Sequence, residues 1–520
     1  MGGKETNQQN SVTKQIAINM FFGIVAFVLN LGISFFITPY ITRQFGTEAY
    51  GFVKMADDFT SYAALFSVAL NSMASRFLML EKERGNMAEA KKYFSSITLA
   101  NVVLSAILII PSLVCVIYLE RFLEIPSALV SEVKLTFALT FAAFLANLFF
   151  STYGNCFYLT NRLSVSSIRD AFTTILRVTT IIALFFFTTP RISYMAVGGV
   201  VVAVFTVIYN CYYTRKLIPE FRFCFVDFEW KKLLEVLSSG IWNSITRLSQ
   251  IFSSGLDLLL TNTMIGSQMM GYLSVAKTIP NLVATFNATV SNVFIPNLMM
   301  LYARDNMEEL KKATKTAMKF MCLFVSIPNA ILITMGKPFF ELWVPGEPSQ
   351  LINILSVLTI LNSCVTGPAQ PLYQIFTITN KIKQSSTVLI LYGFTSILVT
   401  YICLSVTNLG VYAVAGVSLV GSLIVALCYH IPFAAKYIGL PKLTFFPEIG
   451  FSIVSMLILC VVGYGIRSVI AVESSWLMWF AGACLTGILG LCINGALILN
   501  KEERGILLGK VRSLVGKLKR

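Results

Sequence analysis

The sequence predicts an all-α polytopic membrane protein with about 14 transmembrane helices. We expect two six-helix bundles related by a pseudo-two-fold axis along the membrane normal, plus two extra C-terminal helices. Three observations predict this class: the composition, a series of apolar runs of helical length, and an internal repeat. Hydrophobic residues make up 56% of the 520 residues and charged residues only 12%, whereas a soluble domain carries about a quarter charged residues.

The apolar runs set the number of spans. A hydrocarbon core about 30 Å thick takes roughly 20 apolar residues as a helix. Fourteen runs of this kind are found, at 16–38, 50–75, 94–119, 129–158, 164–188, 192–214, 236–263, 270–300, 314–342, 350–379, 385–406, 410–435, 447–470 and 475–498. The polar start of the chain indicates that the first run is a span and not a signal peptide.

The distribution of basic residues supports this count. With the N-terminus in the cytoplasm, 30 of the 40 lysines and arginines fall in the inner segments and six in the outer loops. Cytoplasmic loops carry such an excess, so both termini are predicted to be cytoplasmic. The net charge of +15 then marks the inner face of a membrane protein, and we expect no nucleic-acid partner.

The internal repeat relates residues 46–92 to residues 266–312, with 13 identities in 47 positions at a shift of 220. Similarity continues at a shift of 219, where Thr160–Arg162 matches Thr379–Lys381. The shift contains six spans, so both copies enter the membrane in the same sense. The predicted parts are an N-terminal bundle at 1–218, a C-terminal bundle at 219–440, two further helices at 441–500 and a basic cytoplasmic tail at 501–520.

Several kinds of site are not expected. The 11 cysteines are scattered without a C-x-x-C pair, which indicates packing residues and no disulfide framework or metal site. No G-x-x-x-x-G-K-[ST] motif is present, so no ATP site is predicted. No outer loop is long enough for a catalytic domain. We therefore expect no enzyme, no catalytic residue and no cofactor.

Ionisable residues inside predicted spans are the candidates for function, because each costs roughly 3 kcal/mol near the membrane centre. Lys54, Asp57 and Asp58 share one face of the second span. The repeat aligns Lys277 with Asp57, which predicts opposite charges across a shared cavity. Arg247 has no acid three or four residues away. Lys54, Arg247 and Lys277 are therefore the predicted substrate-binding residues, although the Lys54 group is equally consistent with a cluster that only neutralises itself.

Three further residues complete the candidates. Asp257 is a predicted ion-coupling carboxylate, together with Asp57 and Asp58. Arg177 lies on the fifth span, away from the predicted axis, and is expected to be a structural partner. His430, the only histidine, is expected near the end of a span. The balance of these groups is cationic, which favours an anionic substrate such as a phosphate or pyrophosphate head group.

Short motifs give the chain a family resemblance. G-T-E-A-Y-G-F occurs at Gly46–Phe52, after a first span that ends in Thr38-Pro39, and E-L-W-V-P-G-E occurs at Glu341–Glu347. Together with T-N-R and T-N-K before the fifth and eleventh spans, these resemble the Wzx-like lipid-linked oligosaccharide flippases, or polysaccharide biosynthesis proteins. That family belongs to the multidrug/oligosaccharidyl-lipid/polysaccharide exporter superfamily.

The resemblance implies a V-shaped pair of bundles around a cationic cavity, in the cytoplasmic (inner) membrane of a bacterium. It implies transport by alternating access of an oligosaccharide on undecaprenyl pyrophosphate, for O-antigen, capsule or exopolysaccharide export. In the related lipid II flippases cavity cations hold the pyrophosphate, and Lys54 and Lys277 lie at comparable places. A proton or sodium gradient, or the membrane potential, would drive release, and a single chain with both halves would work as a monomer.

Two alternatives remain. A multidrug or cation antiporter of the same superfamily would have an acidic, aromatic-lined cavity. A membrane glycan polymerase or ligase would need catalytic groups outside the membrane.

Overall fold

The structure, a computed structural model, describes residues 31–32, 34–160, 162–500 and 504. The described residues form helices and connecting turns, with no strand among them. Eleven of the described helices are long and apolar enough to cross a membrane. They coincide with the predicted spans two to six and nine to fourteen, and the predicted all-α polytopic fold is confirmed.

The other three predicted spans have separate explanations. The first, 16–38, lies mostly outside the described residues. The seventh and eighth overlap the helices Trp230–Gln250 and Ser267–Asn292, which are not among the eleven that are long and apolar enough to cross a membrane. Polar membrane helices face protein or water in preference to lipid. Fourteen crossings therefore remain the plausible total.

The chain divides into two compact units, Met1–Ser274 and Val275–Arg520. In the first unit the helices are α2 (Thr47–Glu83), α3 (Met87–Ile117), α4 (Leu119–Phe122), α5 (Val130–Phe149), α6 (Cys156–Leu159), α7 (Leu163–Phe187), α8 (Tyr194–Leu217), α9 (Trp230–Gln250), α10 (Asp257–Met264) and the start of α11 (Ser267–Asn292). A turn of 3-10 helix at Ser151–Asn155 precedes α6, and a π-helical turn at Ile251–Gly255 joins α9 to α10.

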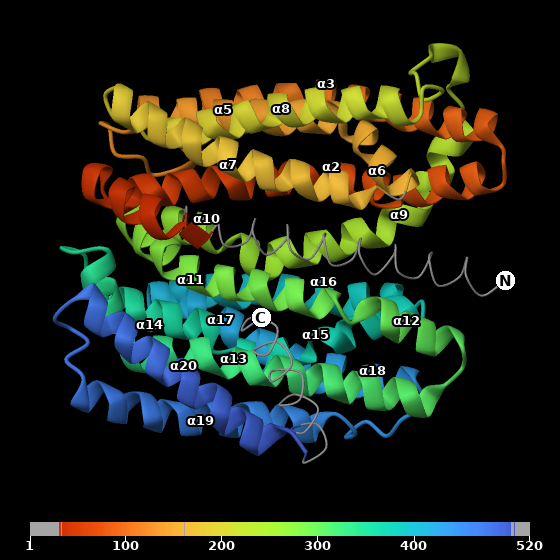
Figure 1. The fold of residues 1–520 in the computed structure, drawn as a ribbon. Helices are drawn as coiled ribbons and strands as arrows, with labels where there is room; N and C mark the ends of the chain where they lie inside the picture. The colour runs from red at the N-terminus through yellow and green to blue at the C-terminus, as the bar shows by residue number, and fades with distance from the viewer. Residues whose placement is uncertain (1–30, 33, 161, 501–503, 505–520) are drawn as a thin grey trace, which may run out of the picture. The chain divides into compact units, whose positions relative to one another are not determined.

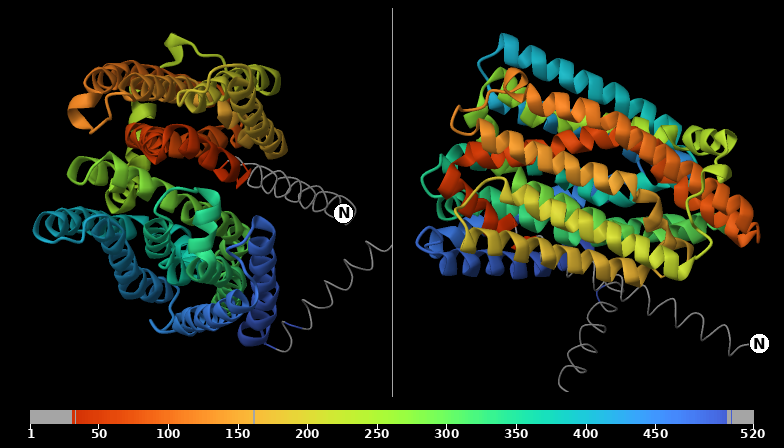
Figure 2. Two further views of the ribbon diagram at one scale, coloured as in Figure 1. Left: turned by 90° about the vertical axis from the view of Figure 1, so that its left-hand side faces the viewer. Right: turned by 90° about the horizontal axis from the view of Figure 1, so that it is seen from above.

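Within the first unit, α2 packs against α3, α5 and α9, while α8 packs against α5 and α7. Figures 1 and 2 show α3, α5 and α8 side by side on one face of α2, and α9 on its other face. Because α9 packs so extensively on α2, the compact unit extends beyond the predicted bundle boundary at 218/219. That boundary rests on the repeat, which compactness does not test, so it stays a prediction.

In the second unit the helices are the rest of α11, α12 (Ile295–Ala303), α13 (Met307–Trp343), α14 (Ser349–Ile360), α15 (Ser363–Ile378), α16 (Ile382–Val406), α17 (Val411–Val425), α18 (Ile431–Tyr437), α19 (Phe446–Val469) and α20 (Trp476–Ile498). A π-helical turn at Ala426–His430 joins α17 to α18. Helix α13 is central and packs against α14, α15, α19 and α20. The two extra C-terminal helices are thus an integral part of this unit.

A buried polar network fastens α19 and α20 to α13. The Asn494 amide donates to the Leu323 carbonyl at 2.9 Å and to the Ser326 hydroxyl at 2.8 Å. The Ser455 hydroxyl of α19 donates to the Asn494 side-chain carbonyl and lies 2.8 Å from the Ser326 hydroxyl. Asn494, Ser326 and Ser455 are all fully buried. A satisfied polar network between helices specifies one way of docking them.

Helix boundaries recur at the offsets of the sequence identities. Glycines with positive φ, Gly46 (86°) and Gly266 (132°), stand just before α2 and α11. The interruptions that separate α2 from α3 and α12 from α13 hold Gly85 and Asp305, both at positive φ. At the offset of 219, the first residues of α5 and α14, and of α7 and α16, correspond. Each half therefore uses the same start and stop signals.

Candidate functional site

The candidate site in the first unit is built on the contact between α2 and α9. A Cβ on Gly240 would stand 1.8 Å from the Ala69 carbonyl oxygen, so the two backbones touch at this point. The Ser244 hydroxyl donates to the Leu65 carbonyl at 3.4 Å and the Asn243 amide to the Ser72 hydroxyl at 3.1 Å. Small residues allow such close approach of membrane helices, and polar side chains then join them.

Lys54 lies half-buried on the first half of α2. Its Nζ stands 5.3 Å from the ring centroid of Tyr50, one turn earlier, in a cation–π contact. Asp57 and Arg177 are close enough to act on its charge. Of these, Asp57 is exposed and Arg177 is half-buried.

Arg177 belongs to α7, and a Cβ on Gly198 of α8 would stand 3.5 Å from its Cγ, so the side chain passes close to the α8 backbone. Its Nε is buried and makes no hydrogen bond within the part of the chain that the structure describes. Sequence reasoning assigned Arg177 a structural role. Arg177 is also close enough to Lys54 to act on its charge, so the structure places a second cation near Lys54.

A second group of polar side chains surrounds Tyr62, two turns after Lys54 on α2. The Tyr62 hydroxyl donates to the Gly255 carbonyl at the end of the π-helical turn. Asp58 and Asp257 are both close enough to this hydroxyl to act on its charge. Asp257 is buried, at 9% exposure, in the first turn of α10. The structure therefore brings two of the three predicted coupling carboxylates to one tyrosine, and Asp57 lies instead with Lys54.

The remaining predicted substrate-binding residues are Arg247 and Lys277. Arg247 is half-buried on α9, and its Nη1 donates to the Gln250 Oε1 at 3.3 Å. Lys277 is half-buried on the part of α11 that belongs to the second unit. The predicted cavity shared by Lys54, Arg247 and Lys277 therefore stays a prediction.

A polar core in the same unit was missed by sequence reasoning. The fully buried Asn101 of α3 exchanges side-chain hydrogen bonds with Asn71 of α2, both at 3.0 Å, and donates to the Thr152 hydroxyl at 3.1 Å. Ser151 donates to Asn71 at 3.0 Å. The only signal in the sequence was the presence of asparagines in apolar runs. These bonds hold α2, α3 and the 3-10 turn together beside the candidate site.

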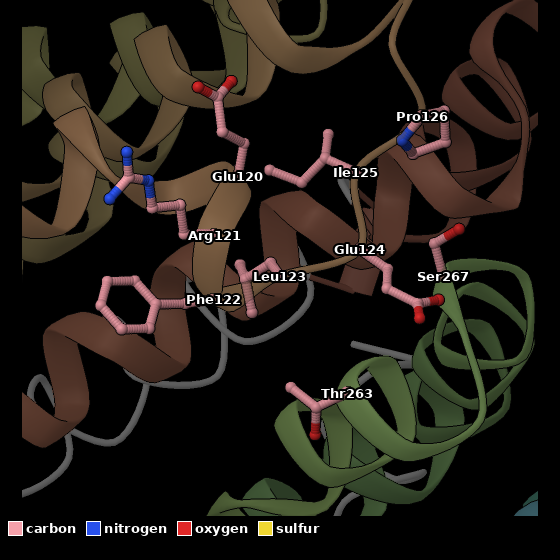
Figure 3. Close-up of a pocket in the computed structure, with 9 residues that line it drawn as sticks. All are labelled: Glu120, Arg121, Phe122, Leu123, Glu124, Ile125, Pro126, Thr263 and Ser267. Atoms are coloured by element: carbon pink, nitrogen blue, oxygen red, sulfur yellow. The ribbon is translucent and has the colours of Figure 1, made fainter.

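Figure 3 shows a cavity of about 560 Å³ at the end of the first unit where α4 leads towards α5. Its lining comprises Glu120, Arg121, Phe122, Leu123, Glu124, Ile125, Pro126, Thr263 and Ser267. The Asn262 side chain donates to the Glu124 carbonyl at 3.1 Å and accepts from the Glu124 N–H at 2.9 Å. These two hydrogen bonds between the Asn262 side chain and the Glu124 backbone fix the loop against α10. The cavity contains none of the six predicted site residues.

The starts of the two repeated segments, at α2 and α11, contact each other within the first unit. A Cβ on Gly51 would stand 3.1 Å from the Gly271 Cα, and one on Gly271 would stand 2.7 Å from the Thr47 carbonyl carbon. Gly51 and Gly271 are equivalent in the repeat at 220 residues. Glycine is therefore required at both positions, since α2 and α11 begin in direct backbone contact.

Comparisons with known proteins agree with this fold. Residues 16–302 match the family described as "Polysaccharide biosynthesis protein". The chain is 26% identical over 505 residues to the Bacillus subtilis (strain 168) protein "Uncharacterized membrane protein EpsK", covering 96% of this chain and 99% of that protein.

Two solved structures share the fold at low identity. The lipid II flippase MurJ in an inward closed conformation has a TM-score of 0.65 at 16% identity, covering 92% of this chain and 98% of its own. An inward-facing multidrug resistance MATE family transporter of the MOP superfamily has a TM-score of 0.61 at 15% identity, covering 82% and 97%. The predicted family is confirmed: the chain is a multi-pass membrane protein that belongs to the polysaccharide biosynthesis protein family.

Proposed function

We propose that this protein moves a lipid-linked oligosaccharide, carried on undecaprenyl pyrophosphate, from the inner to the outer leaflet of the bacterial cytoplasmic membrane. Its product would feed the export of a surface polysaccharide. The observation that carries the proposal is the pair of half-buried cations, Lys54 and Arg177, in the membrane-spanning part of the first unit. The family and the fold neighbours, which include a flippase and a transporter, support a transport function over an enzymatic one.

The energetics favour an anionic ligand at this pair. Each cation costs roughly 3 kcal/mol at the centre of a membrane, and two cations close together also repel. The cation–π contact with the Tyr50 ring offsets about 1–2 kcal/mol of this cost for Lys54, and Asp57, an acid that acts on its charge, is exposed. A pyrophosphate would neutralise both cations and accept charge-assisted hydrogen bonds from the Lys54 ammonium and the Arg177 guanidinium. The polyprenyl chain would remain in lipid.

Arg247 and Lys277 keep the roles predicted from the sequence. Arg247 would meet the saccharide or its phosphates from α9, and Lys277 would contribute the second unit's cation. Because one chain holds both halves, we propose that a monomer is sufficient and that both termini lie in the cytoplasm.

Ion coupling would act through the group around Tyr62. Asp58 and Asp257 would take up a proton or sodium ion, and loss of negative charge there would change the hydrogen bond that joins α2 to the Gly255 carbonyl. That bond joins α2 to the π-helical turn that follows α9, so a change in it reaches α2, the helix that holds Lys54. The membrane potential supplies a further 2.3 kcal/mol per charge per 100 mV. We propose that these terms drive alternating access.

A second candidate function is drug or cation antiport. The observation that favours it is the Asp58–Asp257 pair, since a carboxylate pair inside a membrane suits a cationic substrate, and one fold neighbour is named a multidrug resistance transporter. The neighbouring Lys54 and Arg177 argue against it.

The test is complementation of a deletion strain by Lys54→Ala, Arg177→Ala and Lys277→Ala. A matched control is Lys337→Ala, which removes a partly exposed lysine 3.7 Å from Glu341. We expect loss of surface polysaccharide and accumulation of the lipid-linked precursor with the first three variants, and wild-type behaviour with the control. Full complementation by Lys54→Ala and Arg177→Ala would remove the phosphate-binding role. A glycan that crosses the membrane without being polymerised would favour a polymerase or ligase.

A further inference from the structure

The segment that joins α8 to α9, Ile218–Glu229, is fastened to α3 along its length. The Cys224 N–H donates to the Ser95 hydroxyl at 3.4 Å. The Ser96 hydroxyl accepts from the Glu229 N–H at 2.9 Å and donates to the Glu229 carbonyl at 3.3 Å. The Phe221 ring, which is buried, stacks on Phe94 of α3 with centroids 5.0 Å apart. The segment is therefore held in a defined position on α3 by hydrogen bonds and ring stacking.

Two lysines of α3 hold two of the three acids of this segment. Lys91 pairs with Asp227 at 2.9 Å, and Lys92 pairs with Glu229 at 2.8 Å. Asp227 and Glu229 are thus engaged towards the protein, while Arg222, the adjoining Lys231 and the third acid, Glu220, are exposed.

The tip of the segment carries apolar side chains away from the protein. Phe225 is 72% exposed and Val226 is 90% exposed. Figure 1 shows this yellow-green loop after α8 leaving the end of the helix sideways, and Figure 2 shows the same protrusion from a second direction. A fastened base prevents the tip from folding back onto the unit, so the exposed apolar side chains need a partner.

The position of the segment identifies that partner. Helix α8 ends with Tyr212, whose ring lies 5.7 Å from the Lys216 ammonium, and with Arg215. Exposed tyrosines with basic residues mark the membrane–water interface at the cytoplasmic end of a span. The segment begins two residues later and runs sideways to the span, which keeps its tip at head-group depth. Apolar side chains flanked by bases suit the surface of an anionic membrane.

We propose that Ile218–Glu229 anchors the first unit to anionic phospholipid of the inner leaflet. Phe225 and Val226 enter the boundary between head groups and acyl chains, and Arg222 and Lys231 contact lipid phosphates. The anchor holds the N-terminal end of α9 at fixed depth while α9 carries the contacts to α2. The inference rests on the proposed orientation of the chain but not on the transported substrate.

The experiment places the photocrosslinking residue p-benzoylphenylalanine at position 226 of the full-length protein. The protein is reconstituted in nanodiscs that contain equal amounts of phosphatidylglycerol and phosphatidylethanolamine, and adducts are identified by mass spectrometry. The matched control carries the same residue at position 220, where Glu220 is also exposed but polar. We expect lipid adducts at least fivefold more abundant at 226 than at 220, and enriched in phosphatidylglycerol.

Equal adducts at both positions, or no lipid adduct at 226, would overturn the anchor. Equal capture of the two lipids would overturn its preference for anionic lipid. The double variant Arg222→Glu/Lys231→Glu should abolish the enrichment while leaving the adduct at 226. Because crosslinking requires no transport, this result is separate from the fate of the proposed substrate.

Discussion

Replacing Gly240 by alanine tests the backbone contact on which the candidate site is built. The added Cβ would stand 1.8 Å from the Ala69 carbonyl oxygen, whereas real Cβ contacts essentially never fall below 3.0 Å. Helix α9 must therefore retreat from α2 by about 1 Å or more. Overpacking of this kind costs about 1–3 kcal/mol. Strain on the bonds from Ser244 to Leu65 and from Asn243 to Ser72 adds about 0.5–1 kcal/mol each.

The total of about 2–5 kcal/mol predicts a fall in the unfolding midpoint of roughly 2–5 °C for a chain of 520 residues. The assay is thermal unfolding in detergent, followed by the monodisperse fraction in size-exclusion chromatography. Gly199→Ala is the matched control, because Gly199 lies in α8 and a Cβ there meets nothing within 4 Å. That variant should keep or raise the midpoint, since alanine favours a helix over glycine by about 1 kcal/mol. Equal midpoints for the two variants would refute the close packing of α2 on α9.

Three further predictions follow from buried polar groups. Asn101→Leu leaves Asn71 and Thr152 without their buried partner and should lower the unfolding midpoint by several degrees; an unchanged midpoint would contradict the network. Asn494→Leu should loosen α20 from α13, measured as faster hydrogen exchange in α20 than in α8, and equal exchange in variant and wild type would count against it. Asp257→Asn should reduce gradient-driven transport at least tenfold while substrate binding persists, and an intact response to the gradient would remove Asp257 from coupling.

The spans were predictable because the hydrocarbon core imposes length and composition on every helix that crosses it. Apolar runs therefore predicted the eleven long apolar helices. The repeat aligned Gly46 with Gly266, and in the structure these glycines stand just before α2 and α11. The seventh span was also predicted as an apolar run, but the sequence did not predict the interruption between α9 and α10. The π-helical turn at Ile251–Gly255 accepts a hydrogen bond from Tyr62, which lies on a helix distant in sequence, and a local pattern cannot show such a contact.

The sequence predicted which residues belong to the candidate site better than it predicted which of them lie close together. Charge alone singled out Lys54, Asp58, Asp257 and Arg177 within apolar runs. Spacing along one helix could not show that Arg177 of α7 approaches Lys54 of α2, because that proximity depends on how two helices pack. Tyr62 carries no charge and was overlooked, although it stands four residues after Asp58 on the same helix and so was within reach of the spacing argument.

The most direct measurement is transport by the purified protein in proteoliposomes. A short-chain polyprenyl pyrophosphate that carries a saccharide is placed in one leaflet, and its arrival in the other is followed by a membrane-impermeant glycan-modifying reagent. The account predicts transfer by the wild type and by Lys337→Ala, and a rate at least tenfold lower with Lys54→Ala and with Arg177→Ala. Transfer no faster than in protein-free liposomes, together with efflux of a cationic dye, would contradict it.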